Sequence, residues 1–262
     1  MNRTWNFTDL ELFALWERAT TTWLPWPLVM TARVRTRSEL DSQMRQALNR
    51  VERAHPEFID TVLATLLEPD IQIAVHGSDG SDSMKPDTLV RVYAARRGDT
   101  GYVVSQKPGE TYWHSGGYTV TECDALRLAD LVVQAIPEAE AGREADYILP
   151  TEDRAEELDY SFASSVVQDS FTDSVHSRSA RFVAAPDQFV GTIDITQGRS
   201  RFGPRGVTRH RLDWRDIEGD GRYVVIPEGT PATAVAADSK RFVQLINGRI
   251  AEVVRAIKDE RA

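Results

Sequence analysis

The chain has 262 residues, 41% of them hydrophobic and 27% charged, with a formal net charge of −9, so it can form a substantial core and is poorly suited to bind nucleic acid or an anionic membrane. Its single cysteine, Cys123, excludes an internal disulfide framework. The N-terminus lacks a signal-peptide pattern and no stretch reaches the roughly 18 apolar residues of a membrane span, so we expect a cytoplasmic protein.

The N-terminal residues predict a short strand over 5–8 and then a helix. Thr8 and Glu11 have the spacing of a capping box, in which each side chain accepts a hydrogen bond from the other residue's backbone amide. Phe7 and Leu12 stand at the positions of a hydrophobic staple around this box. Apolar residues occur on more than one side of the helix, which indicates that the helix is buried.

Two candidate binding features follow the first helix. Residues 23–28 hold two tryptophans and two prolines and cannot be helical, because each proline favours an extended residue before it. We interpret this segment as a core-filling loop rather than a ligand platform. Arg33, Arg35 and Arg37 alternate over 29–37, so on a strand they share one face. We interpret that face as solvated rather than as a patch for phosphate or an acidic partner.

The rest of the first half is predicted as two helices, four strands and one more helix. Helices that start at Ser38 and Pro56 precede the strands, and a helix capped by Thr121 and Asp124 follows them. Between them the hydrophobic period changes from 3.6 to 2. The predicted strands are 70–76, 88–96, 102–106 and 111–118. Residues 77–86, between the first two strands, form a polar and flexible connector.

Residues 137–150 are expected to join the two halves of the chain. The second half is predicted as a long helix from Asp153, four strands, and a last helix from Thr230. The predicted strands are 180–185, 188–196, 207–217 and 222–226. The last two enclose an acidic turn at 218–221, because Asp-Gly between apolar runs marks a hairpin. The last helix carries an apolar stripe formed by Phe242, Ile246, Ile250, Val253 and Ile257.

Both halves therefore show helix, four strands and helix in the same order. Residues 101–109 and 221–229 are also loosely similar, which suggests an internal duplication about a pseudo-twofold axis. We predict an α+β fold in which helices flank a central antiparallel β-sheet. The expected division is an N-terminal α+β half over 1–150 and a related C-terminal α+β half over 151–262, which together form one compact domain.

Motifs for catalysis and cofactor binding are missing from the sequence. It has no glycine-rich phosphate loop or nucleophile elbow, and its histidines do not pair at metal-ligand spacing, so we expect no enzyme activity, no cofactor and no metal. Cys123, expected at a helix N-terminus, stands between two acidic residues that oppose thiolate formation. The run from Asp216 to Gly221 resembles part of a calcium loop, but Pro227 occupies the position that requires a bidentate glutamate.

Two alternative functions stay open from the residues alone. The first is a metal-dependent enzyme with an acidic site on the 208–229 hairpin, formed by Asp216, Asp220 and His210. The second is a nucleic-acid adaptor whose contacts would be Arg33, Arg35, Arg37, Arg199, Arg201 and Arg205. The net charge of −9 argues against the adaptor, because nucleic-acid binding depends on positive charge.

Three features of the sequence, in order, resemble the EspG family of cytosolic chaperones for type VII (ESX) secretion in mycobacteria and related actinobacteria. The first is the helix with Phe7-Thr8, Phe13 and Leu15-Trp16-Glu17, followed by 24–28. The second is Pro69-Asp70 before the first strands, and the third is Asp216 with Asp220-Gly221-Arg222-Tyr223. The resemblance spans nearly the whole chain.

The resemblance implies an α+β fold of two related halves and binding of a PE–PPE heterodimer through the helical tip of its PPE subunit. It also implies that the loop between the second and third strands, counting 5–8 as the first strand, and the C-terminal helical region make much of the contact. From the net charge, we expect no nucleic acid and no membrane as partners. The corresponding residues here are Gly77, Ser78, Asp79, Gly80, Ser81, Asp82, Ser83, Met84, Lys85, Lys240, Arg241, Gln244 and Arg249. For the helical residues, an ordinary solvated helix face is an equally good interpretation. We expect a monomer or a weak homodimer.

Overall fold

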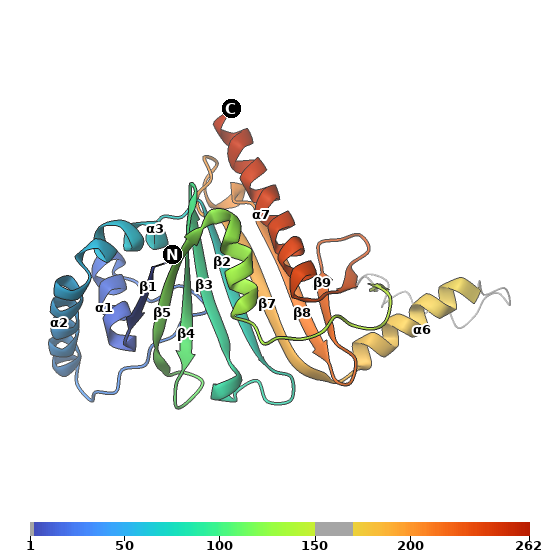
Figure 1. The fold of residues 1–262 in the computed structure, drawn as a ribbon, viewed down its shortest axis with the longest axis horizontal. Coiled ribbons are helices and arrows are strands. Elements are labelled where there is room, and N and C mark those ends of the chain that lie inside the picture. The colour runs from blue at the N-terminus through green and yellow to red at the C-terminus, as the bar shows by residue number, and fades with distance from the viewer. Residues whose placement is uncertain (1–2, 150–169) are drawn as a thin grey trace.

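The segments with a period of 2 form one large sheet. The computed structural model describes residues 3–149 and 170–262, and Figure 1 shows the fold. The strands are β1 (Thr4–Phe7), β2 (Ile71–Asp79), β3 (Val90–Arg97), β4 (Thr100–Pro108), β5 (Ser115–Asp124), β6 (Tyr147–Ile148), β7 (Asp187–Gln197), β8 (Arg209–Ile217), β9 (Arg222–Ile226) and β10 (Thr233–Ala236). Within the described residues they form a ten-stranded sheet in the order β1-β5-β4-β3-β2-β7-β8-β9-β10-β6, and all its strand pairs are antiparallel.

Helices cover both faces of the sheet, as Figure 1 shows. One face carries α1 (Asp9–Thr20), α2 (Arg37–Ala54), a π-helical segment (Phe58–Leu63) and α3 (Ala64–Leu67). The other face carries α4 (Leu128–Gln134) and α7 (Ser239–Arg261). In β3, successive side chains point to opposite faces of the sheet and so contribute to both helix–sheet cores. Val92 and Ala94 pack toward α4 and α7, whereas Tyr93 and Ala95 pack toward the N-terminal helices.

A smaller third cluster lies at the C-terminal end of the sheet. Helix α6 (Ser170–Ala184) contributes Phe182, which packs against Ile217, Tyr223 and Ala234. The predicted helix from Asp153 falls partly on residues 150–169, which lie outside the described residues.

The N-terminal predictions are confirmed in their main features. Strand β1 forms and pairs with β5, and the Thr8–Glu11 capping box is complete at the start of α1. The strand proposed for 29–37 is wrong, because no strand forms there. Helix α2 begins at Arg37 with Thr36 as its N-cap, so the predicted start at Ser38 is wrong by one residue.

The C-terminal predictions fail at two helix boundaries. Residues 180–184 are the last turn of α6 rather than a strand. The chain after Thr230 forms β10, because its backbone pairs with β9 and β6, and α7 starts only at Ser239, where the Asp238 carboxylate accepts from the Arg241 amide. The apolar stripe of α7 is confirmed, since four of its five predicted residues are buried and the fifth packs against the same core.

The two halves of the chain have matching strand orders. Strands β2 to β5 form one antiparallel meander that leads into α4, and β7 to β10 form another that leads into α7. The meanders join through β2 and β7, which pair from Ile71↔Gln197 to Asp79↔Phe189. The loosely similar segments contain β4 and β9, the third strand of each meander. Duplication and the division at residue 150 stay predictions.

Candidate partner-binding surface

The predicted flexible connector is shorter than expected, because β2 continues through Gly77, Ser78 and Asp79. Ser78 is buried. A Cβ on Gly77 would lie 2.8 Å from the rings of both Phe189 and Trp214, so glycine lets these rings lie against the strand. Gly77 and Ser78 are therefore structural residues of the sheet, and the exposed loop begins at Gly80.

The loop Gly80–Lys85 is ordered by side-chain hydrogen bonds to its backbone. The Asp79 carboxylate accepts from the Ser81 amide, the Ser81 hydroxyl and the Asp82 amide, and these bonds lower the pKa of Asp79. The Asp82 carboxylate accepts from the Met84 amide at 3.0 Å. The loop is therefore a set of Asx turns that presents one large apolar side chain, Met84, which is 51% exposed.

The predicted helical residues divide into two groups. Lys240, Arg241 and Gln244 are exposed on the first turns of α7. Arg249 is half-buried and donates two hydrogen bonds to Glu252, at 2.9 and 3.0 Å, so it belongs to an ion-pair network rather than to a free surface.

One side chain links the start of α7 to the end of β2. The ring centroids of Phe242 on α7 and Trp214 on β8 lie 5.9 Å apart, and Trp214 also covers Gly77. The structure thus brings the loop Gly80–Lys85 and the first turns of α7 to the same end of the sheet, which we call the loop end.

A row of aromatic rings lies beside β2 at the loop end, and the sequence did not reveal it. Ring centroids are 5.2 Å apart for Trp26 and His76, 6.3 Å for His76 and Tyr112, and 4.7 Å for Tyr112 and Trp113. Trp26 is 56% and Trp113 59% exposed. The prediction that 23–28 fills the core holds only for its leucines, because Trp23 and Trp26 are both exposed while Leu24 and Leu28 are buried.

A buried arginine, Arg91, packs against Tyr112 in this aromatic row. The Arg91 guanidinium lies 4.3 Å from the centroid of Tyr112 and donates from Nη1 to the Tyr112 carbonyl at 2.7 Å. Its Nε and Nη2 have no hydrogen-bond partner among the described residues. Burial and the Arg91 charge lower the pKa of His76, so its imidazole is neutral at neutral pH and packs against Trp26 as an uncharged ring, with the two ring planes tilted by 35°.

The acidic side chains of the 208–229 hairpin are engaged in contacts within the fold. The Asp216 carboxylate accepts two hydrogen bonds from the fully buried Arg222, at 2.6 and 2.7 Å. Asp220 accepts from the Tyr223 hydroxyl at 2.8 Å, and His210 lies between two glutamates. Among residues 3–149 and 170–262, no group of three His, Cys, Asp or Glu side chains has a metal-binding arrangement. The turn itself forms as predicted, and its residue with a positive φ, 74°, is Gly219.

Cys123 is not at a helix N-terminus. It lies in β5 opposite Gly101, because the chain makes a 3₁₀ turn (Ala125–Arg127) before α4 begins. Burial is the main cause that raises the pKa of its thiol to about 11, and the neighbouring carboxylate of Asp124 adds to it. The thiol is therefore protonated and unreactive at neutral pH.

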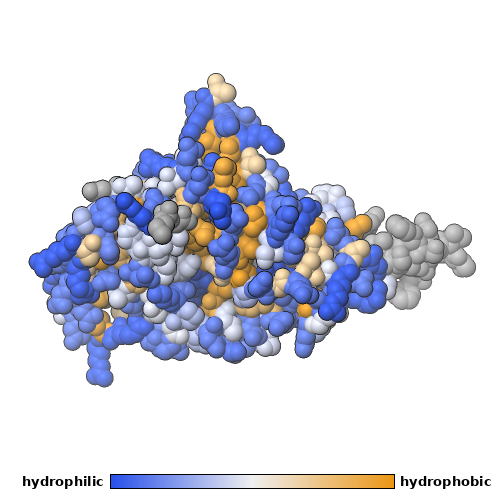
Figure 2. Space-filling model, viewed as in Figure 1, coloured by the Kyte–Doolittle hydropathy of each residue, from blue (hydrophilic) through white to orange (hydrophobic). Residues whose placement is uncertain are grey.

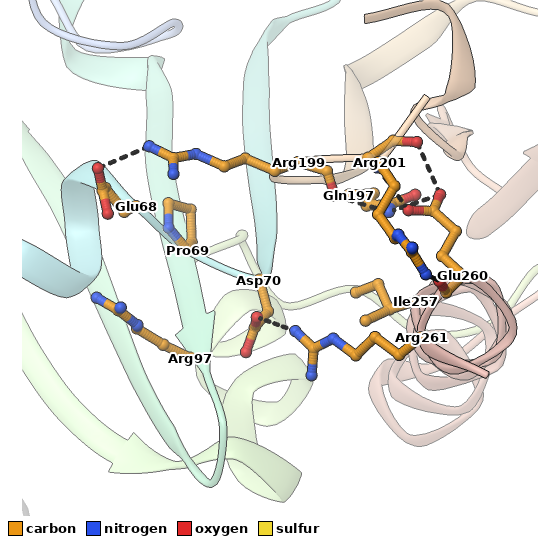
Figure 3. A pocket seen from close by; sticks show the side chains of 11 residues that line it. Glu68, Pro69, Asp70, Arg97, Gln197, Arg199, Arg201, Ile257, Glu260 and Arg261 are labelled. Atoms are coloured by element: carbon orange, nitrogen blue, oxygen red, sulfur yellow. Dashed lines mark hydrogen bonds and ion pairs between the residues drawn. The ribbon is translucent and has the colours of Figure 1, made fainter. Parts of the chain in front are cut away.

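The arginines of the alternative nucleic-acid surface do not form one basic patch. Arg33 pairs with Asp9 and Glu110 on the N-terminal side of the sheet. Arg199 and Arg201 line a cleft of about 350 Å³ beside the C-terminal turn of α7, shown in Figure 3. Two of its arginines form ion pairs, Arg199 with Glu68 and Arg261 with Asp70, and the Glu260 carboxylate accepts from the Arg201 backbone amide. These contacts attach the C-terminal turn of α7 to the turn after β7 and to the start of β2.

No helix in the described part of the chain has the length and apolar character needed to cross a bilayer.

The described residues form an α+β protein with one large antiparallel sheet and helices on both of its faces. The model of the EspG family matches residues 8–248, so the chain belongs to the EspG family. Among solved structures, the chain is similar to the Mycobacterium tuberculosis type VII secretion system chaperone EspG5 in complex with a PE25–PPE41 dimer, with 16% sequence identity, a TM-score of 0.47 and 93% of each chain covered. No curated protein matches the chain.

Proposed function

We propose that this protein is a cytosolic chaperone of a type VII secretion system, which binds the helical tip of the PPE subunit in a PE–PPE heterodimer and keeps the heterodimer soluble until export. The observation that carries the proposal is membership of the EspG family over residues 8–248. A protein of this kind acts by covering an apolar surface of its cargo. It therefore needs exposed contact residues and no catalytic group.

We further propose the loop end as the cargo-binding surface. Trp26 and Trp113 are large and exposed, and tryptophan is strongly enriched among the residues that dominate binding energy. They supply the aromatic anchors that Gly80–Lys85 lacks. Lys240 and Gln244 lie at the same end of the sheet on α7, which covers the opposite face, and add polar groups of the kind usual at the edge of an interface.

Co-expression with a PE–PPE pair tests the proposal. The heterodimer is expected to accumulate as insoluble protein alone and to co-elute with this chain on size exclusion when both are present. Replacing both Trp26 and Trp113 by alanine is expected to weaken the complex by about 30-fold or more, the effect of losing about 2 kcal/mol at a hot spot. Failure of the wild-type chain to bind or solubilise any PE–PPE pair would refute the chaperone function.

Phe202 offers a matched control for the tryptophans. It is 76% exposed and lies in the turn between β7 and β8, at the sheet end opposite the loop end. Phe202→Ala is expected to leave cargo affinity unchanged. An equal loss of affinity in Phe202→Ala and in the double tryptophan variant would show that the cargo does not select the loop end.

A binding role without catalysis is part of the proposal. It is supported by the engagement of Asp216, Asp220 and His210 in internal contacts. Calorimetric titration with calcium, magnesium and zinc is expected to give no binding heat. Saturable binding of one ion with loss on Asp216→Asn would revive the metal-dependent alternative.

A further inference from the structure

A second exposed apolar surface lies far from the loop end. It is a groove of about 510 Å³ between the 3₁₀ turn that precedes α4 and the C-terminal half of α7. Its lining residues are Arg96, Ala125, Leu126, Asn247, Ile250, Ala251, Val254, Arg255 and Lys258. Leu126 is 75% exposed, although it is a large apolar residue. Figure 2 shows an apolar band over α4 and α7 that is edged by hydrophilic residues.

The rim of this groove carries positive charge that the fold does not neutralise. Arg255 and Lys258 form no ion pair within the described residues, and Arg96 donates only to the Gly98 carbonyl, at 3.1 Å. Two carboxylates close by in sequence make other contacts, since Asp124 accepts from the Leu126 amide and Asp130 pairs with Arg127. Within the described residues, neither forms an ion pair with Arg96, Arg255 or Lys258. Uncompensated positive charge is unusual here, because the chain as a whole has a net charge of −9.

Strand and helix geometry separate the groove from the loop end. Arg96 lies six positions beyond Val90 on β3, which corresponds to roughly 20 Å at the rise of a strand. Arg255 lies fourteen positions beyond Arg241 on α7, roughly 21 Å at the rise of a helix. A ligand in the groove therefore leaves the loop end free.

We propose that this groove docks an amphipathic α-helix of a second protein partner, distinct from the cargo, with an apolar stripe flanked by acidic side chains. A groove between two helical segments accommodates such a helix, with side chains at i, i+3 or i+4 and i+7 inserted into the apolar floor. Leu126 forms one wall of the contact. Arg96, Arg255 and Lys258 meet the carboxylates on either side, which selects acidic helices over basic ones.

Fluorescence anisotropy with two synthetic helical peptides tests the inference. Both carry the same leucine stripe, one flanked by glutamates and the other by lysines. The glutamate peptide is expected to bind at least ~10-fold more tightly, with an affinity that falls as salt is added, because the preference comes from charge. Equal binding of the two peptides, or binding of neither, overturns the proposal.

Substitutions in the groove test whether the peptide binds there. Exchanging Arg255 and Lys258 together for glutamate, or Leu126 for serine, is expected to weaken the glutamate peptide by ~10-fold or more. All three side chains are exposed, so these variants are expected to keep the fold. Arg205→Glu, an exposed change in another turn, is the control and is expected to bind as the wild type does. Wild-type affinity in the groove variants contradicts the proposal.

A third experiment distinguishes binding of this partner from binding of the cargo. The complex with a PE–PPE heterodimer is expected to bind the glutamate peptide as tightly as the free chain does, and the groove variants are expected to keep their cargo affinity. Displacement of the peptide by the cargo, or loss of cargo binding in the groove variants, would assign the groove to the cargo and refute a second partner. Failure of the wild-type chain to bind cargo bears on the proposed function only.

Discussion

Replacing Arg222 by methionine is expected to destabilise the protein strongly, because the hairpin around it is scaffold rather than a site. The Arg222 side chain is 0% and the Asp216 side chain 8% exposed, and their shortest contact is 2.6 Å. Arg222 also donates to the Pro137 carbonyl at 2.7 Å and lies 5.6 Å from the centroid of Phe242. Methionine keeps the apolar stem but leaves the buried Asp216 carboxylate without its partner.

The expected cost follows from the burial of that charge. Removing one member of a buried ion pair typically costs about 3–5 kcal/mol, whereas replacing both members by apolar residues is often close to neutral. The double variant Arg222→Met, Asp216→Leu is therefore expected to regain about 2 kcal/mol or more over the single variant. It is not expected to recover fully, because the Pro137 carbonyl loses its donor at a cost of about 1 kcal/mol.

Equilibrium unfolding in urea, followed by tryptophan fluorescence, measures these differences. Arg211→Met is the matched control: Arg211 pairs with Asp213 on the same hairpin, but the two side chains are 53% and 30% exposed. Arg211→Met is expected to lower the free energy of unfolding by less than about 1 kcal/mol. A loss below 1 kcal/mol for Arg222→Met as well, or equal losses in its single and double variants, would refute the assignment of Asp216 and Arg222 to the scaffold.

Three further predictions concern single sites. Gly221→Val is expected to lower thermal stability, because even a Cβ at this position would lie 2.6 Å from the Ala141 carbonyl oxygen; an unchanged melting temperature would contradict this close approach. The Cys123 thiol, with a pKa raised to about 11, is expected to react with iodoacetamide at about pH 8 far more slowly in the folded than in the urea-unfolded chain, and equal rates would show that it is accessible as a thiolate. Arg33 lowers the pKa of Glu110 to about 2, so the ion pair stabilises the fold above the ordinary glutamate pKa of about 4.3 and is lost as pH falls through 2. Carboxyl NMR titration is expected to show Glu110 near its ordinary pKa in Arg33→Ala, and an unchanged low pKa would identify a different cause.

Local signals in the sequence predicted much of the fold because their causes are local. The Thr8–Glu11 capping box forms as its spacing requires, and the last helix buries the predicted stripe from Phe242 onward. The predicted boundaries of helices and strands were wrong where pairing with a neighbouring strand determines the local structure. The chain after Thr230 is a strand because β9 and β6 lie beside it, and a short sequence pattern contains no information about those neighbours.

The candidate site was less predictable, because it is assembled from distant segments. The polar composition of Gly80–Lys85 predicts an exposed loop. The aromatic side chains of the loop end, Trp26, His76 and Trp113, come from three segments that are distant in the sequence. Two tryptophans next to prolines are compatible with a buried plug and with an exposed platform. Only the packing of Leu24 and Leu28 beneath them distinguishes these arrangements.

Hydrogen–deuterium exchange of the chain, alone and bound to a PE–PPE heterodimer, tests the central claim most directly. The account predicts that binding slows exchange in peptides that cover residues 22–30, 80–89 and 110–115. It predicts unchanged exchange in peptides that cover 125–134 and 250–258, which line the separate groove. Protection confined to the groove, with the loop end unchanged, would contradict the assignment of the loop end to the cargo.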